Sequence, residues 1–314
     1  MILCCGEALI DMIPSSTGSG AEGFVPHSGG AIFNTAIALG RLGVPTGFLT
    51  GLSTDLFGAQ LAADLESSHV DTRYAIRSDL PTTLAFVRLT QGHATYTFYD
   101  ENTAGRSLSP DSLPDVPDTA DVLYFGGISL ISEPCADFYA ALAVREAPNR
   151  VIALDPNIRP GFIKDEPRYR ARLERMIAVA DILKVSDEDL NWIVQGAETL
   201  EQKSQHLLAK GPRVLVLTKG SAGALAFVEG RSAVAVTARK ASVVDTVGAG
   251  DTFNAGMLES LFNANLLRKY ALASAGDADL TAALARGAQV AAVTVSRAGA
   301  NPPWLHELES QVTP

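Results

Sequence analysis

Residues 245–256 read Asp-Thr-Val-Gly-Ala-Gly-Asp-Thr-Phe-Asn-Ala-Gly, close to the C-terminal end of a chain of 314 residues. A strand-like run over 243–247 leads into the glycines, and a helical pattern begins at Asp251. Glycines let the backbone turn tightly and leave its N–H groups uncovered. At a helix N-terminus these N–H groups lack partners and the helix dipole is positive. The segment therefore predicts an anion site that suits a phosphoryl group.

Asp251 is the candidate catalytic residue of this segment, because it would lie in the first helical turn beside the anion. A carboxylate there can accept a proton from an attacking hydroxyl and hold its oxygen in line. A free Asp has a pKa of about 3.9, and we expect the helix N-terminus to lower it further. Taken alone, the segment also fits an ordinary Gly-rich turn capped by an acid. It is neither a Walker A loop nor a Rossmann fingerprint, because no Gly-Lys-Ser/Thr and no βαβ unit follow.

The composition narrows the class of protein. Hydrophobic residues make up 47% of the chain, which argues against disorder. With 25 Lys and Arg against 35 Asp and Glu, the net charge is −10, so a nucleic acid is not an expected partner. Three cysteines without metal or disulfide spacing suggest a reducing compartment. We find no signal peptide and no apolar stretch of about 18 residues, and therefore expect a cytoplasmic protein that does not bind membranes.

Short apolar runs alternate with helical patterns along most of the chain. The strand-like runs are 2–5, 47–50, 122–125, 151–154, 182–185 and 213–217, and the helical stretches are 34–42, 58–67, 134–145, 169–179, 200–208, 251–262 and 277–294. This alternation favours an α/β fold with a mainly parallel central sheet covered on both faces. We expect one domain over residues 1–314.

Two segments interrupt this pattern. Residues 83–90 and 94–100 alternate with period two around 91–93, as in a hairpin with one wet face, and residues 14–28 are polar and Gly-rich. Together, 14–28 and 82–100 predict a small β-sheet outside the main one, serving as a lid or an oligomer contact. The alternative is a surface hairpin without a role.

At this point a family resemblance is visible. Residues 245–256 closely resemble the second signature of the PfkB-type carbohydrate kinases of the ribokinase superfamily, and residues 29–36, Gly-Gly-Ala-Ile-Phe-Asn-Thr-Ala, resemble the first. Residues 6–11 match the family's first strand, and the runs 81–86, 98–104 and 155–160 look most like bacterial fructokinases. The resemblance extends over nearly the whole chain. It implies a ribokinase-like three-layer core with a β-sheet lid, and a reaction that converts ATP and D-fructose to ADP and fructose 6-phosphate.

The resemblance also implies roles for individual residues. Asp251 matches the catalytic base, and the amides of Gly248, Ala249 and Gly250 match the anion hole. The positions that bind the sugar are Asp11, Gly29, Gly30 and Asn34, with Phe98 on the hairpin covering its apolar edge. Asn157 and Arg159 follow a predicted strand, where α/β sheets bind ligands, and Arg159 could neutralise phosphate charge. The alternative for these two is a polar pair that stabilises the loop.

The nucleotide and metal sites follow from the same comparison. The expected ATP-binding residues are Lys184, Thr218, Lys219, Gly220 and Gly223, together with Gly248 and Gly250, and adenine is expected near 288–292. The family's Asn-x-x-Glu reads Ser186-x-x-Asp189 here, so either Glu188 or Asp189 could serve Mg²⁺ through water, or simply be a helix-start acid. A K⁺ ion could bind beside Asp245 and Val247.

Several alternatives stay open from the sequence. The sugar could be 2-keto-3-deoxygluconate or ribose rather than fructose, since only contacts from the lid and first strand would differ. A non-catalytic sugar- or nucleotide-binding regulator is opposed by the intact Gly-Ala-Gly-Asp, and a dinucleotide oxidoreductase by the absence of Gly-x-Gly-x-x-Gly after the first strand. Glu7 could be an exposed strand-end residue or a neighbour of the sugar. Because exposed hairpin edges favour pairing, we expect a homodimer through the lid.

Overall fold

The computed structural model describes residues 1–90 and 93–309, with residues 88–90 and 93–95 described by their backbone alone. Its centre is a nine-stranded sheet. In spatial order the strands are β15 (Val234–Val236), β14 (Ala224–Phe227), β13 (Val214–Thr218), β12 (Ile182–Ser186), β11 (Val151–Asp155), β10 (Val122–Gly126), β1 (Ile2–Cys5), β4 (Thr46–Leu49) and β6 (Val70–Asp71). All neighbours pair in parallel except β13–β14 and β14–β15. The predicted mainly parallel sheet is confirmed, with an antiparallel edge that was not predicted.

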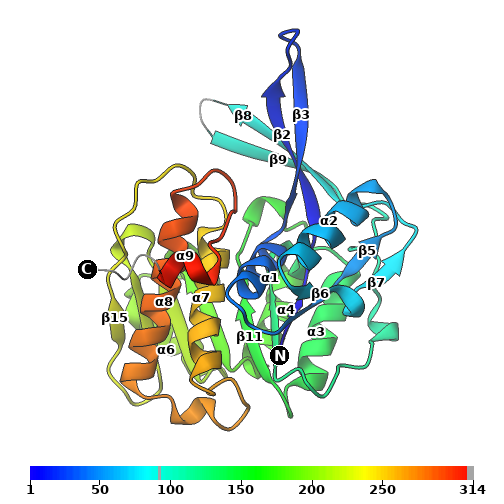
Figure 1. The fold of residues 1–314 in the computed structure, drawn as a ribbon. Helices are drawn as coiled ribbons and strands as arrows, with labels where there is room; N and C mark the ends of the chain where they lie inside the picture. The colour runs from blue at the N-terminus through cyan, green and yellow to red at the C-terminus, as the bar shows by residue number, and fades with distance from the viewer. Residues whose placement is uncertain (91–92, 310–314) are drawn as a thin grey trace.

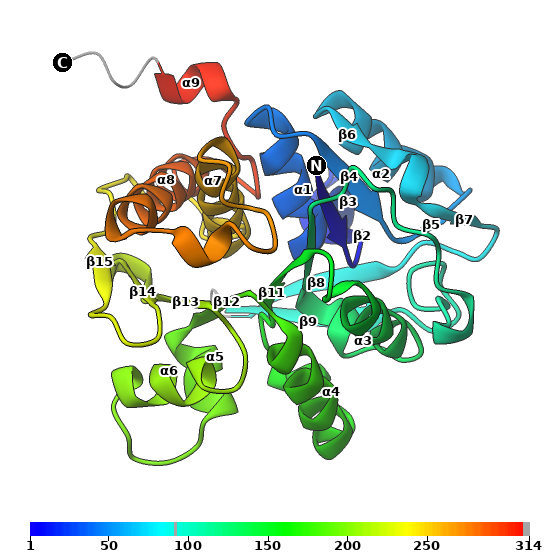
Figure 2. The ribbon, with the colours of Figure 1, turned by 90° about the horizontal axis from the view of Figure 1, so that it is seen from below.

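Helices cover both faces of this sheet (Figure 2). One layer contains α1 (Ala31–Arg41), α2 (Leu56–Ser67), α7 (Ala249–Asn263) and α8 (Asp277–Val295), and the other contains α3 (Cys135–Glu146), α4 (Glu166–Val179), α5 (Asp187–Ile193) and α6 (Leu200–Leu208). Because strand side chains alternate, Ile2 and Cys4 join one buried core, whereas Leu3 and Cys5 join the other. The result is the expected three-layer core, and all three cysteines are free and buried.

A second sheet of four strands projects from the core (Figure 1). Its order is β3 (Glu22–Gly29), β2 (Leu9–Ser16), β8 (Leu84–Thr90) and β9 (His93–Tyr99). Both segments that the sequence singled out are in this sheet, although the first begins earlier than predicted, at Leu9. Since only three residues separate β2 from β1, the small sheet grows directly from the carboxyl end of a central strand.

The arrangement of strands gathers chain segments at one edge of the large sheet. From β1 the chain proceeds to β4 on one side, and later returns to β10 on the other side. Such a change of direction creates a crevice at the carboxyl ends of the strands, where open α/β sheets bind ligands. Gly127 follows β10 at this edge, Asp155 ends β11 and Ser186 ends β12. Within residues 1–90 and 93–309, no helix is long and apolar enough to cross a membrane.

Candidate active site

The first turn of α7 forms the floor of the site. Its N-cap, Gly248, has a φ of 76°, and a Cβ there would stand 2.6 Å from the Cβ of Ala300. Only glycine therefore fits both the left-handed backbone and the close approach. The strand predicted over 243–247 was wrong, since no strand forms there; the segment is held by Val244 N, which donates to Val295 O at 2.8 Å.

Several N–H groups of this turn are open. Ala249 N donates to Thr246 O at 3.3 Å, and Thr252 N to Gly248 O at 2.9 Å. By contrast, the amides of Gly248, Gly250 and Asp251 have no acceptor among the described residues. Of the three amides predicted to form the anion hole, those of Gly248 and Gly250 are therefore free to donate to a ligand. The third, of Ala249, already has a weak partner. Open amides at a helix N-terminus suit a phosphoryl group.

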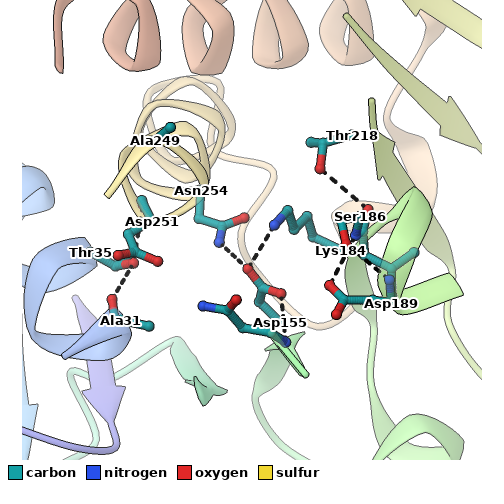
Figure 3. Close-up of polar contacts among 12 residues, drawn as sticks. Ala31, Thr35, Asp155, Lys184, Ser186, Asp189, Thr218, Ala249, Asp251 and Asn254 are labelled. Carbon is teal, nitrogen blue, oxygen red and sulfur yellow. Dashed lines mark hydrogen bonds and ion pairs between the residues drawn. The ribbon is translucent and has the colours of Figure 1, made fainter. Parts of the chain in front are cut away.

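Asp251 is buried, with 7% of its surface exposed. Asn34 Nδ2 donates to its Oδ2 at 2.9 Å, and Thr35 Oγ1 donates to its backbone oxygen at 3.1 Å; Figure 3 shows Thr35 next to Asp251. Burial raises its pKa to about 7, although the bond from Asn34 opposes this rise. The prediction of a lowered pKa was wrong, because desolvation outweighs the helix terminus. A carboxylate with a pKa near neutrality is better suited to act as a general base.

A cavity of about 250 Å³ opens beside Asp251 and holds most of the predicted sugar-binding residues. Its lining includes Asp11, Gly30, Asn34, Phe98, Asn157, Arg159, Val247, Gly248, Ala249, Gly250 and Asp251. Burial raises the pKa of Asp11 to about 6. Gly29 is not part of the lining, but a Cβ on it would stand 2.2 Å from Asp11 Oδ2. Its absent side chain thus leaves room for the Asp11 carboxylate.

A second cavity, of about 590 Å³, lies on the other side of the same turn. It is lined by Thr218, Gly220 and Gly223 as predicted, and by Ala288, Ala291 and Ala292 of α8, where adenine was expected. Of the predicted nucleotide residues, Lys184, Lys219 and Gly248 do not line it. The two cavities share Thr246, Ala249 and Gly250. They therefore meet at the open amides, with Asp251 on the side of the smaller cavity.

Asn157 and Arg159 lie on the loop that follows β11. Asn157 has a left-handed backbone, with a φ of 44°. The exposed Arg159 guanidinium donates to Ile158 O at 3.1 Å and more weakly to Asn157 O at 3.4 Å. These contacts stabilise the loop, yet both residues also line the smaller cavity. Arg159 thus brings a positive charge to the wall of that cavity.

Sequence reasoning missed a polar group beneath α7. Asp155 Oδ2 accepts hydrogen bonds from Lys184 Nζ at 2.9 Å and from Asn254 Nδ2 at 2.7 Å (Figure 3). Asn254 Nδ2 also donates to Tyr124 Oη at 2.8 Å. Two signals were available: Asp155 ends an apolar strand, and Asn254 follows Asp251 by three residues on the same helix. Such a helical spacing places both side chains on similar faces.

Glu7, whose role the sequence left open, is half-buried and lines the smaller cavity. Its Oε1 accepts from Ala31 N at 2.9 Å, and its Oε2 accepts from Ser129 N at 3.2 Å. Burial raises its pKa, although these hydrogen bonds oppose the effect. Glu7 therefore caps the start of α1 and ties it to the turn after β10, which leaves Asn34 correctly placed one turn further on.

The predicted metal residues have other contacts. Asp189 forms a capping box with Ser186, and its second oxygen accepts from Ile158 N at 2.9 Å, so it is a helix-start acid; Glu188 is exposed. Asp245 accepts from Val247 N at 3.0 Å and Gly299 N at 2.9 Å. No group of three His, Cys, Asp or Glu residues gathers as a metal site in the described part of the chain.

Comparison with known proteins agrees with this geometry. The chain is 54% identical over 275 residues to a fructokinase of Rhizobium leguminosarum bv. trifolii, covering 87% of this chain and 83% of that protein. It is 34% identical over 272 residues to the probable chloroplastic fructokinase-6 of Arabidopsis thaliana, covering 83% of this chain and 70% of that protein. The crystal structure of a Xylella fastidiosa fructokinase with bound ATP superposes with a TM-score of 0.87 at 26% identity, over 99% of this chain and 97% of that one. The model of the pfkB family of carbohydrate kinases matches residues 1–307, and the chain belongs to this family.

Proposed function

We propose that the chain transfers the γ-phosphoryl group of ATP to the primary hydroxyl of D-fructose and gives fructose 6-phosphate. The observation that carries this proposal is the meeting of two cavities at the first turn of α7, where open amides lie beside the buried Asp251. The larger cavity suits a nucleotide, since it combines apolar helix residues with a Gly-rich turn. The smaller, polar cavity suits a sugar.

The proposed mechanism assigns one task to each part of the site. Asp251 accepts the proton of the attacking hydroxyl and keeps its oxygen directed at the phosphorus. The amides of Gly248 and Gly250 donate to the phosphoryl oxygens, where negative charge is held during transfer. Arg159 adds positive charge from the wall of the smaller cavity. Asp11 and Asn34 form hydrogen bonds with the sugar hydroxyls. Asn34 also holds the Asp251 carboxylate in place, because its Nδ2 donates to Asp251 Oδ2 at 2.9 Å.

The metal requirements are part of the proposal. Mg²⁺ usually binds through substrate phosphates and keeps several waters, which agrees with the absence of a carboxylate cage in the described residues. It would neutralise phosphate charge. Glu188, which is exposed, suits an outer contact through water better than Asp189, whose two oxygens each accept a backbone amide. A K⁺ ion beside Asp245 and Val247 would be tested by turnover and ATP affinity with and without K⁺.

The choice of fructose rests on the 54% identical Rhizobium relative, which is named a fructokinase. The test is a coupled assay of ADP release with ATP and Mg²⁺ across fructose, glucose, ribose, 2-keto-3-deoxygluconate and nucleosides. We expect the highest kcat/KM with fructose and a product that a 6-phosphate-specific coupling enzyme accepts. A higher kcat/KM with another sugar would replace fructose as the substrate, and absence of ADP release with every acceptor would contradict kinase activity itself.

The small sheet is proposed to act as a lid and as the contact of a homodimer. Phe98 lines the sugar cavity from β9, and β3 and β9 are the edge strands of the sheet. On the β2–β3 hairpin, Phe24 and Val25 are 47% and 43% exposed, which favours burial against a second copy. Residues 1–314 would then work as one cytoplasmic kinase domain. Sedimentation of the intact protein and of a Phe24→Glu variant tests the dimer, since the variant should dissociate more readily.

A further inference from the structure

Four polar side chains, three from the sheet and one from α7, form a buried cluster where α7 packs on the sheet, and none of them lines either cavity. They are Tyr124, Asp155, Lys184 and Asn254, and each has at most 5% of its surface exposed. Asp155 Oδ2 is the centre of this cluster, since it accepts from both Lys184 Nζ and Asn254 Nδ2 (Figure 3). The Asn254 amide orientation is fixed, because its NH₂ group faces two acceptors.

A buried ion pair needs an explanation other than stability. Removing two charges from water costs several kcal/mol per ion, and apolar residues of similar volume often stabilise a protein as well or better. The pair also lies where the strands have just separated: the ladder between β11 and β12 ends at Leu154 and Leu183. Asp155 and Lys184 are the next residues of these two strands. The pair therefore joins the strands at the edge on which the site is built.

The cluster is close to the reacting groups. Lys184 Nζ lies 3.4 Å from the point where a Cβ on Gly250 would stand, and Gly250 lines both cavities. Asn254 is on the same helix as Asp251, one turn later. The charges of the pair act on Asp251 in opposite directions, because Asp155 favours its protonated form and Lys184 its ionised form.

We propose that Asp155 and Lys184 are positioning residues for phosphoryl transfer: through Asn254 they fix α7 over the sheet, and their opposite charges cancel beneath Asp251. The inference rests on the proposed function, in which Asp251 is the base. The other groups that face Asp251 are Asn34 and Thr35 from α1, Glu7 from the turn after β1, and Tyr124 from β10. Lys184 is the buried cation that acts on Asp251, whereas the exposed Arg159 and the carboxylate of Asp11 share the cavity wall with Asp251.

The test is the pH dependence of kcat/KM, whose acidic limb reports the ionisation of the base in the free enzyme. Lys184→Met leaves Asp155 unbalanced, and we expect the limb to move upward by about 1 pH unit or more. Asp155→Asn leaves Lys184 unbalanced, and the limb should move downward by a similar amount. The double variant Asp155→Asn/Lys184→Met has no net charge at this place, so its limb should return to within about half a unit of the wild-type value.

Lys203→Met is the matched control. Lys203 is also buried, at 3% exposure, and donates to Asn191 Oδ1 at 2.8 Å, but it is on α6 and lines neither cavity. Its variant should melt at a lower temperature without moving the limb. Each profile is measured with the best acceptor of the wild-type protein, so an error in the choice of fructose leaves the test intact. Wild-type protein without kinase activity would contradict the proposed function instead.

Two results would overturn the inference. One is a limb that stays in place in both single variants while kcat falls, because a purely structural pair would behave in this way. The other is a double variant that melts like the wild type but has lost turnover or keeps a shifted limb. If Lys184→Met does not fold, the other two variants still decide the question, because the limb should move downward in Asp155→Asn and stay near the wild-type value in the double variant.

Discussion

Replacing Asp251 by Asn should make the protein more stable at neutral and alkaline pH. The carboxyl has a pKa of about 7 in the folded protein, because it is buried, against an ordinary value of 3.8. Below 3.8 the group is protonated in both states and has no effect. As pH rises above 3.8, this carboxyl ionises in the unfolded chain but stays protonated in the folded protein. The free energy of unfolding therefore decreases progressively until the pH exceeds about 7. The substitution Asp251→Asn would remove this penalty, while the oxygen of the new amide could still accept from Asn34.

The magnitude follows from the two pKa values. Each unit of difference corresponds to about 1.36 kcal/mol. The stabilisation by Asp251→Asn should therefore be about 2 kcal/mol at pH 5.5 and about 4 kcal/mol at pH 8.5, where the full difference is reached. The assay is urea denaturation of both proteins at several pH values in this range, with turnover measured on the same samples. We expect the more stable variant to be inactive, as in other stability–activity trade-offs.

The control is Asp115→Asn, which changes an exposed carboxyl in the loop before β10. It should alter the free energy of unfolding by less than about 0.5 kcal/mol at every pH. A constant difference between Asp251→Asn and wild type across the pH range, or a variant less stable than wild type at pH 8.5, would refute the reasoning from burial.

Three further predictions concern kinetics and ATP binding. The wild-type kcat/KM should fall below about pH 7, since Asp251 must be ionised to act as a base, and a pH profile that stays flat down to pH 5.5 would contradict this. Gly29→Ala places a Cβ 2.2 Å from Asp11 Oδ2, so KM for the sugar should rise about tenfold or more while KM for ATP changes little. The control on the same hairpin is Gly18→Ala, whose Cβ meets nothing within 4 Å. Ala291→Trp should fill the larger cavity and weaken ATP binding in calorimetry. Ala282→Trp, on the exposed face of α8, should leave ATP binding unchanged. Equal effects of the two substitutions would place the nucleotide elsewhere.

The parts of the fold that depend on local pattern could be predicted from the sequence. Strands such as 182–185 are short apolar runs, and they form within one residue of their predicted bounds. The small antiparallel strands β14 and β15 were not predicted because they are apolar runs of only four and three residues, and they are defined by pairing with neighbouring strands, β14 with β13 and β15 with β14. The run at 243–247 has β-branched residues but finds no neighbouring strand, so propensity alone was misleading there.

In the site, too, some features could be predicted from the sequence and others depend on tertiary contacts. Asn34 and Asp251 could be paired from the two signatures, and they are joined by a 2.9 Å hydrogen bond although 217 positions apart. The pKa of Asp251 could not be predicted, because desolvation depends on everything that packs around it. Lys184 looked like a nucleotide ligand when read along the chain. Its partner Asp155 is 29 positions away on a neighbouring strand, and only the parallel register brings the two together.

We propose that Asp251 is the base at the junction of the two cavities. The most direct measurement is the turnover of Asp251→Ala with ATP, Mg²⁺ and the best acceptor sugar, combined with calorimetry of ATP binding. We expect kcat to fall by at least about 10³-fold while the Kd for ATP stays within a few-fold of wild type. Near-normal turnover in this variant, with ATP still bound, would contradict it.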